Sequence, residues 1–509
     1  MGLPRSGAGG RVSFVLACDL GGTSFRAALI NAAGTVVAET AVPAPRDIGD
    51  THGSEIDAND WWLAFQAAGA HLMRDDPSAF AAVVAVAICG VTRTQVFLGS
   101  DGQPLRPAIT WRDTRAQVAA DRLKARFSGI HPETDHINAF HPLARLAWLS
   151  DEEPGVFNKL TTAIDPKDYL NFRLTGTLAT DPVSVARLLA SAKPSTTHAT
   201  NLLTAIGAPG TLIPPQREPW EVMGYASEGL PTPFDLLAGR PVLCSSNDTW
   251  VGVVGLGAMR PGYAYNMSGT TEVLGVISRE PKVAEGLLTV DWRGLHQLGG
   301  PSQNGADTMT WLLSLLQGRS DGPLLGDTIA GLLRGSRDPQ PLLFLPYLQG
   351  ERVPYWDPSL RGAFLGLNRR HGATDLAWAV LEGVAFLNRV VLERAEAGLG
   401  QKVKEIRLGG GAATNPIWRQ VKADICRRPV VVGTSQEPGV LGAAILAWTA
   451  LGCFPSIAAA QDALATVSTF HAPDAARSAW YDDLYRLFRC SEDAFTPIAH
   501  TLAAIVRPG

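Results

Sequence analysis

One stretch near the start of the chain combines a carboxylate with bare amides and hydroxyls. A short apolar run ends at Asp19, and Gly21, Gly22, Thr23 and Ser24 follow it closely. The glycine pair permits a tight turn between two strands. The N–H groups of such a turn could hold phosphate oxygens beside a carboxylate that holds a hydrated Mg²⁺. An ordinary hairpin with a surface carboxylate has the same pattern, so the rest of the chain must decide between the two.

The same pattern of strand, turn and strand returns in the second half of the chain. Residues 263–267 are predicted to form a strand, Gly269, Thr270 and Thr271 the turn, and residues 272–276 the strand that follows. Two such phosphate loops suggest two similar domains.

Two other predicted strands end in residues that could bind a ligand. The β-branched run 83–89 is typical of a strand buried on both faces, and Arg93 and Thr94 follow it. A shorter run, 108–111, ends next to Asp113. In an α/β layer the ligand crevice lies beyond the carboxyl ends of the strands. We therefore expect these side chains near a ligand.

Asp248 and a glycine-rich loop also follow predicted strands. Asp248 comes after the strand 242–244 and three polar residues, a position from which a carboxylate can reach an open cleft. The strand 405–408 runs into three consecutive glycines, 409–411, which let a flat ligand lie against bare backbone. Asn415, followed by proline, predicts the N-cap of a helix.

The spacing of apolar residues indicates an α/β protein. Three antiparallel strands are predicted at the start of the sheet, and a helix is predicted over 60–73. A longer helix is predicted to begin with Thr374 as its N-cap and to stop near Gly398. Residues 439–448 are predicted to form a tightly packed helix of small residues.

Composition describes a large soluble protein that does not bind nucleic acid or membranes. The 509 residues suggest two or three domains, and a net charge of −4 with both signs scattered leaves no basic footprint. The longest apolar run, 79–91, is too short to cross a bilayer, which needs about 20 apolar residues. The six cysteines are far apart in the sequence, as reduced core thiols are. We expect a cytoplasmic protein.

Together these motifs resemble, in order along the chain, those of the FGGY carbohydrate kinases, a branch of the actin-like sugar kinase superfamily. The most specific part is GAFLGL at 362–367 followed by DLAWAVLE at 375–382. Three further segments support it: LPYLQGERVPYWDP at 345–358, LGGGAATNPIWRQVKADI at 408–425 and ITWRDTRA at 109–116. The resemblance runs from about Val15 to Leu446.

The resemblance implies an α/β fold with two actin-like (ribonuclease H-like) domains. Each would be a mixed five-stranded sheet flanked by helices, and the two would face one another across a cleft. We expect an N-terminal domain at 1–254, on the sugar and phosphate side, and a C-terminal domain at 255–509, on the nucleotide side. In an alternative arrangement, the last helices pack against the first domain. A homodimer is an expectation at the level of the family.

The resemblance also assigns roles to the residues of this chain. Asp248 would be the catalytic base that takes the proton from the sugar hydroxyl, and Asp19 would be the acid near the metal and phosphates. ATP would be bound by Gly21, Gly22, Thr23, Ser24, Gly269, Thr270, Thr271, Gly410, Gly411 and Asn415. Arg93, Thr94 and Asp113 would lie with Asp248 at the acceptor. The sequence around Asp248 departs from the family's glycine-rich pattern, and the bulky Trp250 is expected to alter the pocket.

The implied reaction is ATP- and Mg²⁺-dependent phosphorylation of a small sugar. ITWRDTRA and residues 299–312 are nearest to gluconate-type members, whereas residues 166–176 and GERVPYWDP are equally at home in xylulose-type members. A ketopentose such as xylulose is the first acceptor, and gluconate or another sugar acid or polyol is the alternative. If Arg93 faces the acceptor, its fork would favour a sugar acid. Alternatively, Arg93 pairs with a neighbouring carboxylate.

A rival of another class is an actin-like ATPase that acts as a switch and has no sugar acceptor. Such a protein shares the two hairpins and the glycine-rich loop at 409–411, which would contact adenosine. It requires neither Asp248 nor the segments around 362–382. The sequence lacks a P-loop, and no dinucleotide fingerprint opens a helix after a strand. The sequence therefore lacks the phosphate-binding motifs that P-loop enzymes and dinucleotide-binding enzymes require.

Overall fold

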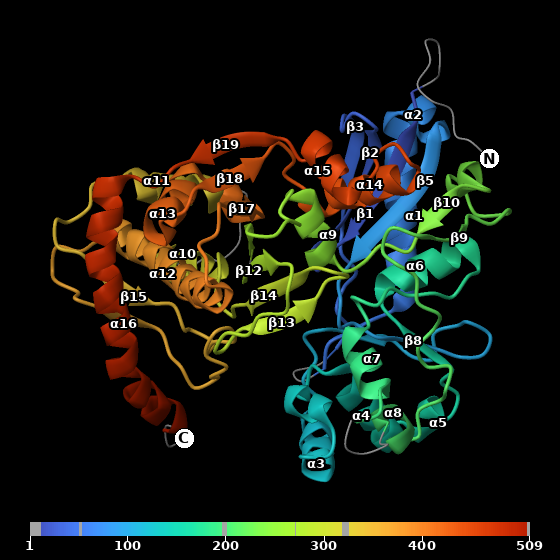
Figure 1. Cartoon of the computed structure of the whole chain (residues 1–509), viewed down its shortest axis with the longest axis horizontal. Coiled ribbons are helices and arrows are strands. Elements are labelled where there is room, and N and C mark those ends of the chain that lie inside the picture. Colours follow the sequence, from blue (N-terminus) through green and yellow to red (C-terminus); the bar gives the residue numbers. More distant parts are fainter. Residues whose placement is uncertain (1–11, 50–52, 196–200, 270, 318–324, 506–509) are drawn as a thin grey trace. The chain divides into compact units, whose positions relative to one another are not determined.

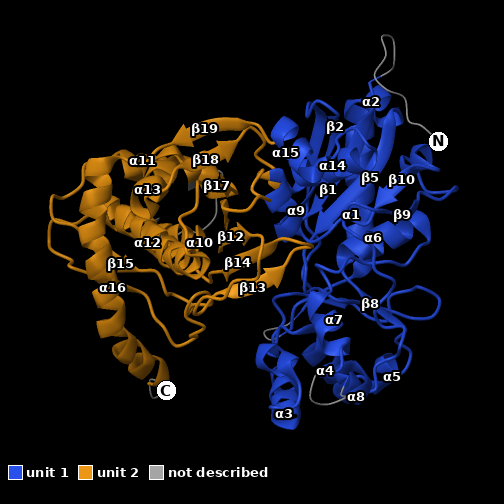
Figure 2. Ribbon diagram, viewed as in Figure 1, with its two compact units in different colours: residues 1–255, 439–464 blue, residues 256–438, 465–509 orange. Residues whose placement is uncertain are grey.

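The chain folds into two compact units, each with its own sheet (Figures 1 and 2). The computed structural model describes residues 12–49, 53–195, 201–269, 271–317 and 325–505. The first unit comprises residues 1–255 and 439–464, and the second comprises residues 256–438 and 465–509. The predicted domain boundary between residues 254 and 255 stays a prediction. The compact units differ from that division because residues 439–464 belong to the first unit.

The first unit is built on a mixed six-stranded sheet in the order β3-β2-β1-β5-β10-β9. As predicted, the chain begins with three antiparallel strands, and β1 then pairs in parallel with β5, and β5 with β10. The strands are β1 (Phe14–Leu20), β2 (Ser24–Asn31), β3 (Val36–Pro43), β5 (Val83–Gly90), β9 (Val222–Tyr225) and β10 (Pro241–Leu243). Parallel pairing brings the carboxyl ends of β1, β5 and β10 to one edge of the sheet.

Helices and two small sheets complete the first unit. The first apolar core lies around β1, β5, α1 and α6, and a second lies among α3, α4, α7 and α8. The helices are α1 (Ala58–Asp75), α2 (Pro77–Ala81), α3 (Gln117–Phe127), α4 (Pro142–Glu152), α5 (Pro154–Phe157), α6 (Pro166–Thr175), α7 (Ala186–Ala192), α8 (Leu202–Ala205), α9 (Asp248–Gly255), α14 (Pro438–Ala450) and α15 (Ile457–Leu464). The small sheets pair β4 (Glu55–Ile56) with β7 (Ala108–Ile109) and β6 (Val96–Leu98) with β8 (Thr162–Ile164).

The second unit repeats the same strand order. Its seven-stranded sheet runs β13-β14-β12-β11-β17-β18-β19. Strands β14-β12-β11-β17-β18 match β3-β2-β1-β5-β10 in order and in parallel or antiparallel sense. The predicted five-stranded sheets are thus present, but edge strands extend them to six and seven. The strands are β11 (Ala264–Ser268), β12 (Glu272–Ser278), β13 (Leu288–Asp291), β14 (His296–Pro301), β17 (Ile406–Gly409), β18 (Val430–Gly433) and β19 (Val467–His471).

Long helices cover the sheet of the second unit. They are α10 (Asp307–Gln317), α11 (Leu325–Arg334), α12 (Ala373–Leu399), α13 (Pro416–Cys426) and α16 (Ala475–Ala504), and β15 (Leu343–Leu345) pairs with β16 (Ala363–Leu365). The start predicted for α12 was wrong, because its N-cap is Gly372 and not Thr374. Asp375 accepts a hydrogen bond from the Gly372 N–H at 2.8 Å, which moves the start of the helix to Ala373.

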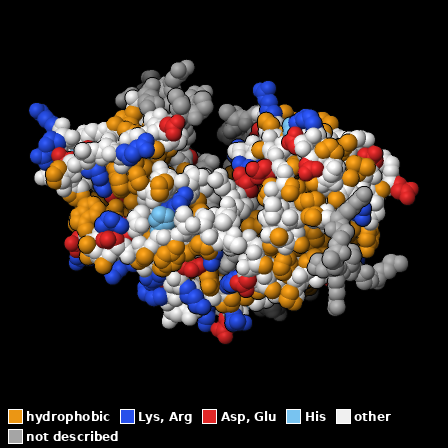
Figure 3. All heavy atoms as spheres, turned by 90° about the horizontal axis from the view of Figure 1, so that it is seen from above, with side chains coloured by type: hydrophobic (Ala, Val, Ile, Leu, Met, Phe, Trp, Pro, Cys, Tyr) orange, Lys and Arg blue, Asp and Glu red, His pale blue; other side chains and the backbone are white. Residues whose placement is uncertain are grey.

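The surface of the protein carries charges of both signs, and its cysteines are free thiols. Among the described residues, no helix is both long and apolar enough to cross a membrane. On the face shown in Figure 3, Lys and Arg side chains are scattered among Asp and Glu side chains. All six cysteines lie in the described part of the chain and are free thiols, and Cys18, Cys89, Cys244 and Cys426 are buried.

Candidate active site

The first predicted phosphate loop is the turn between β1 and β2. The Gly21 N–H donates to the Ser24 carbonyl at 3.1 Å and closes the turn. Gly22 and Thr23 are exposed at its tip. The turn therefore presents backbone amides and a hydroxyl to solvent, which is the arrangement that holds phosphate oxygens.

The glycines of the predicted nucleotide loops fall into two kinds. A Cβ added at Gly22 or Gly411 would meet nothing within 4 Å, and at Gly269 the nearest atom would be 3.9 Å away. The packing of neither unit requires glycine there, so bare backbone faces open space that a phosphate or a flat ring can approach. Gly410 differs, because its φ is +86° and a Cβ would lie 2.5 Å from the Ser268 carbonyl oxygen. Glycine is required at 410 by the fold itself.

The second predicted phosphate loop joins β11 and β12. Thr270 lies outside the described residues. The Gly269 N–H donates to the Thr271 carbonyl at 3.1 Å, and the Gly269 carbonyl accepts from the Ala306 N–H at 2.9 Å. Because Met267 pairs with Gly409, this loop and the glycine-rich loop after β17 lie at neighbouring strand ends.

A buried lysine supports this second loop from inside the unit. Lys422 on α13 is 1% exposed, and its Nζ donates to Glu272 Oε2 at 2.9 Å and to Asn266 Oδ1 at 2.7 Å. Ser268 Oγ, on the other side of the loop, also donates to Glu272. Both ends of the loop are thus fixed to one buried carboxylate.

Asn415 begins α13, as predicted. Its Oδ1 accepts hydrogen bonds from the Ile417 N–H at 2.9 Å and from the Trp418 N–H at 3.3 Å. The side chain therefore orders the end of the loop that contains Gly410 and Gly411. These two hydrogen bonds give Asn415 a structural role. A contact with the nucleotide would be a second role for the same residue.

Asp248 begins α9, directly after the loop that leaves β10. Its Oδ1 accepts from the Thr249 N–H at 2.6 Å and from the Thr249 hydroxyl at 3.2 Å. Burial raises the pKa of Asp248 to about 6, although these hydrogen bonds act in the opposite direction. A carboxylate with that pKa is suited to accept a proton near neutral pH. Trp250 is 2% exposed and packs beside Trp220 inside the unit.

Asp19 and Asp248 lie near the same buried thiol. Asp19 on β1 is opposite Cys89 on β5, and Gly90 forms an isolated bridge with Asn247, the residue before Asp248. The pKa of Cys89 is raised by burial and then by the negative charges of Asp19 and Asp248. The first unit therefore brings both predicted catalytic carboxylates to one edge of its sheet.

The start of α14 closes over Asp19. A Cβ at Gly439, the second residue of this helix, would lie 2.2 Å from Asp19 Oδ2. The Gly439 carbonyl accepts a weak hydrogen bond from Cys89 Sγ at 3.7 Å. Glycine at 439 is therefore needed for the helix to start this close to the carboxylate.

Arg93 and Thr94 follow β5, as the sequence indicated. Arg93 is exposed and has a positive φ of 55°, which is unusual for a residue with a side chain. Its carbonyl accepts a hydrogen bond from Arg145, a fully buried residue of α4. Thr94 is 1% exposed, and its hydroxyl accepts from the Trp111 N–H at 3.2 Å. Thr94 thus fixes the backbone beside Arg93.

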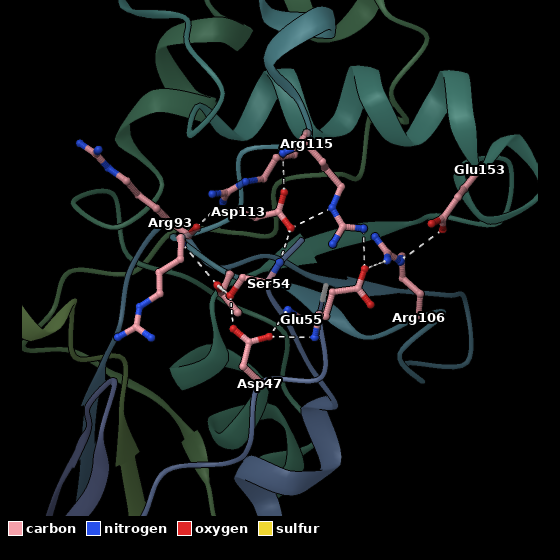
Figure 4. Close-up of polar contacts among 12 residues, drawn as sticks. Asp47, Ser54, Glu55, Arg93, Arg106, Asp113, Arg115 and Glu153 are labelled. Atoms are coloured by element: carbon pink, nitrogen blue, oxygen red, sulfur yellow. Dashed lines mark hydrogen bonds and ion pairs between the residues drawn. The ribbon is translucent and has the colours of Figure 1, made fainter. Parts of the chain in front are cut away.

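Asp113 is the centre of a buried network (Figure 4). Its Oδ2 accepts from the Ser54 N–H and from Arg115 Nε, both at 2.8 Å. Its Oδ1 accepts from the Arg115 N–H at 2.9 Å. Glu55 then joins Arg115 to Arg106 in the same network. Asp113 therefore organises the loop after β7 through several hydrogen bonds.

The residues around Asp19 fit a magnesium ion that is held mainly by phosphates and water. Mg²⁺ keeps several waters and is often bound through only one or two carboxylates plus substrate phosphates. Within the described residues, no group of three or more His, Cys, Asp or Glu side chains could hold a metal by itself. The single carboxylate of Asp19, next to the exposed turn at Gly22, matches that kind of site.

Several residues that support the predicted loops and carboxylates within each unit were not predicted from the sequence. They are Cys89, Gly439, Lys422 and Glu272, and a buried cluster behind Asp248 described below. Cys89 contacts Gly439, and Lys422 contacts Glu272, across a large distance in sequence, so local patterns gave no sign of these contacts. The only available signal was Pro438–Gly439 at the start of a small-residue helix.

Comparison with known proteins places both halves of the chain in one family. Residues 14–255 match the N-terminal domain of the FGGY family of carbohydrate kinases, and residues 264–451 match its C-terminal domain. The chain is 30% identical to a xylulose kinase of Escherichia coli over 92% of this chain and 97% of that protein. It is 27% identical to a gluconokinase of Bacillus subtilis, over 96% of this chain and 98% of that protein.

A solved structure agrees over nearly the full length. The ligand-bound xylulose kinase of Lactobacillus acidophilus superposes with a TM-score of 0.81 at 25% identity, and the match covers 95% of this chain and 98% of that one. Both family domains are therefore present in one chain. The chain belongs to the FGGY family of carbohydrate kinases and is an ATP-dependent sugar kinase.

Proposed function

We propose that the protein transfers the γ-phosphoryl group of ATP to a hydroxyl of a ketopentose, with xylulose as the first acceptor. The observation that supports the chemistry best is Asp248, a carboxylate at the start of α9 whose pKa is raised to about 6 by burial. The support for xylulose comes from the xylulose kinases among the similar proteins.

Asp248 acts as the base in this proposal. As the acceptor hydroxyl attacks the γ-phosphorus, its proton passes to the Asp248 carboxylate, and ADP leaves. The exposed amides at Gly22, Gly269 and Gly411 hold the nucleotide, because phosphoryl transfer depends on positioning and charge stabilisation more than on covalent chemistry. Asp19 would hold Mg²⁺, which neutralises charge on the phosphates when it is bound.

A sugar acid such as gluconate is the second candidate acceptor. The observation in its favour is the positive charge beside Arg93. The pKa of Arg145 is lowered to about 10, mainly by burial; the charge of Asp113 opposes this shift and the nearby charge of Arg93 adds to it. The exposed guanidinium of Arg93 would favour a carboxylate on the acceptor. The gluconokinase similarity agrees with this alternative.

We also propose that the enzyme acts in the cytoplasm, where its six free thiols would stay reduced. A homodimer is part of the same proposal. Gel filtration with light scattering would test it, and a mass equal to that of one chain would remove it.

The direct test of Asp248 is the change Asp248→Asn. The amide keeps the shape of the side chain but cannot accept the proton, so kcat should fall by about 10²-fold or more. Binding of ATP, measured by calorimetry, should stay nearly unchanged. Asp121→Asn on the exposed face of α3 is the matched control and should keep full activity. Near-normal turnover of Asp248→Asn would remove Asp248 from this role.

A further inference from the structure

A completely buried ion cluster lies behind the loop that carries Asp248. Lys167 and Asp168 of α6, together with Asp181, are all 0% exposed. Lys167 Nζ lies 2.5 Å from Asp168 Oδ1 and 3.0 Å from Asp181 Oδ2. Burial alone would lower the pKa of Lys167, but the two carboxylates outweigh it and raise the pKa above its usual range. We call these three residues the Lys167 cluster.

The Lys167 cluster is connected to the loop 244–247 by two hydrogen bonds. Lys167 Nζ donates to the Cys244 carbonyl at 3.3 Å. Ser246 Oγ, also fully buried, donates to Asp181 Oδ1 at 2.7 Å. Both contacts lie within four residues of Asp248, and both come from side chains far away in the sequence.

The loop needs such support. Ser245 has a positive φ of 57°, a conformation that a residue with a side chain keeps only when its surroundings hold it. Asn171 of α6 adds hydrogen bonds from Nδ2 to the Leu243 carbonyl at 3.1 Å and to the Cys244 carbonyl at 3.3 Å. Helix α6 is therefore hydrogen-bonded to the end of β10 and to the start of the loop.

Asp248 itself has little direct restraint on its side chain. The hydrogen bonds that described residues make to its carboxylate come from its neighbour Thr249. The direction of the carboxylate is then set by where the loop places the first residue of α9. A buried ion pair adds little net stability compared with apolar residues of the same volume. The effect of the cluster is thus expected mainly in geometry.

We propose that the Lys167 cluster positions Asp248 for proton transfer through Ser246 and the Cys244 carbonyl. This inference rests on the proposed role of Asp248 as the base. Lys167, Asp181 and Ser246 are positioning residues, since none of them needs to touch the acceptor. When the link is lost, the loop can relax and the carboxylate moves away from the acceptor hydroxyl.

The structure offers two matched variants for the test. Lys167→Met would leave two carboxylates buried without a counter-ion, and the protein could fail to fold. Ser246→Ala removes only the hydroxyl that joins the cluster to the loop. Thr180→Val removes a hydrogen bond of the same kind and length, from Thr180 Oγ1 to Asp168 Oδ2 at 2.7 Å, which joins the cluster to Thr180 and not to the loop. Both hydroxyls belong to fully buried residues.

The full-length wild type and both variants are compared by steady-state kinetics and thermal unfolding. The acceptor is the one with the highest wild-type turnover among D-xylulose, D-gluconate, ribitol and glycerol. Ser246→Ala should lower kcat by about 10- to 100-fold, since a displacement of about 1 Å can cost 10²-fold. Its KM for ATP should stay within about 2-fold, as in Thr180→Val. Both variants should lose similar thermal stability, and Thr180→Val should keep kcat within about 3-fold.

Equal kcat values in the two variants, whether both normal or both reduced, would overturn the inference. A fall in kcat that follows the loss of thermal stability in both would do the same, because it would indicate a structural role alone. If the wild type is active and Asp248→Asn is inactive, such a result rejects the positioning role and leaves the proposed function in place. If the wild type releases no ADP with any acceptor, both are rejected.

Discussion

At the scale of single residues, the raised pKa of Asp248 predicts a particular pH dependence. The base must be ionised to accept a proton, and burial raises its pKa to about 6. Below that pH the carboxyl group is mostly protonated, so kcat/KM for the acceptor should fall tenfold per pH unit. Above it, kcat/KM should reach a plateau. The measurement is kcat/KM from pH 4.5 to 8 with direct detection of ADP.

An ordinary aspartate would give a different profile. An Asp in water has a pKa of about 3.9, and activity would then persist to about pH 4. A plateau that extends unchanged below pH 5 would therefore contradict the assignment of Asp248 as a buried base.

Arg93 is predicted to act on the acceptor and not on ATP. It is exposed next to the carboxyl end of β5, and Arg145 holds its carbonyl. Hydrogen bonds from a charged group are worth about 1.5–3 kcal/mol, so Arg93→Ala should raise the acceptor KM by about 10- to 100-fold. The KM for ATP should change little. Arg122→Ala, an exposed position on α3, is the control and should leave both constants unchanged. Equal effects of Arg93→Ala on both substrates would place Arg93 elsewhere.

At the scale of elements, the start of α14 is predicted to control Asp19. A methyl group at Gly439 would collide with Asp19 Oδ2 at 2.2 Å, so Gly439→Ala should displace the carboxylate. Turnover should fall by about tenfold or more, and the Mg²⁺ concentration for half-maximal rate should rise. A magnesium titration of the rate measures both effects.

Gly331 provides the matched control for that change. It lies in α11, and a Cβ there would meet nothing within 4 Å. Gly331→Ala should leave turnover unchanged and stabilise the helix by up to about 1 kcal/mol, because alanine favours helices. An unchanged magnesium dependence in Gly439→Ala would count against the role of Asp19.

The elements that carry the site were largely predictable from local sequence. The buried strand β5 and the N-cap at Asn415 follow from apolar patterning and from short-range capping, and both are confirmed. The start of α12 was predicted at Thr374, but Asp375 caps backward to Gly372. Thr374 is a residue type that often caps a helix, and Gly372 stands three residues before Asp375, as in a capping box. Local sequence therefore left the choice between the two N-caps open.

The contacts that position the catalytic side chains were not predictable in the same way. Lys167 meets the Cys244 carbonyl, and Asp19 lies against Gly439, through tertiary packing between segments far apart in the chain. A buried lysine has no periodic signature of its own. The sequence therefore predicted which residues could do chemistry, whereas the residues that hold them in place required the structure.

At the scale of the whole molecule, the two units share a set of five strands with the same pairing. These five strands have the same order in both sheets, and a turn with an open glycine, Gly22 or Gly269, follows the first of them in the chain. Each unit also has a buried lysine behind a functional loop, Lys167 in the first and Lys422 in the second. The first unit carries both carboxylates, and the second carries the glycine-rich loop. In the proposed reaction, each unit would supply a different part of the phosphoryl-transfer chemistry.

The most direct test of the central claim is ADP release by the full-length enzyme with ATP and Mg²⁺ across ketopentoses, aldonates, polyols and glycerol. D-Xylulose is predicted to give the highest kcat/KM, with gluconate second. Asp248→Asn should abolish the acceptor-stimulated release. Highest activity with a polyol or glycerol would contradict the assigned acceptor. ATP hydrolysis that no member of the panel stimulates would contradict the proposed reaction and favour an ATPase switch.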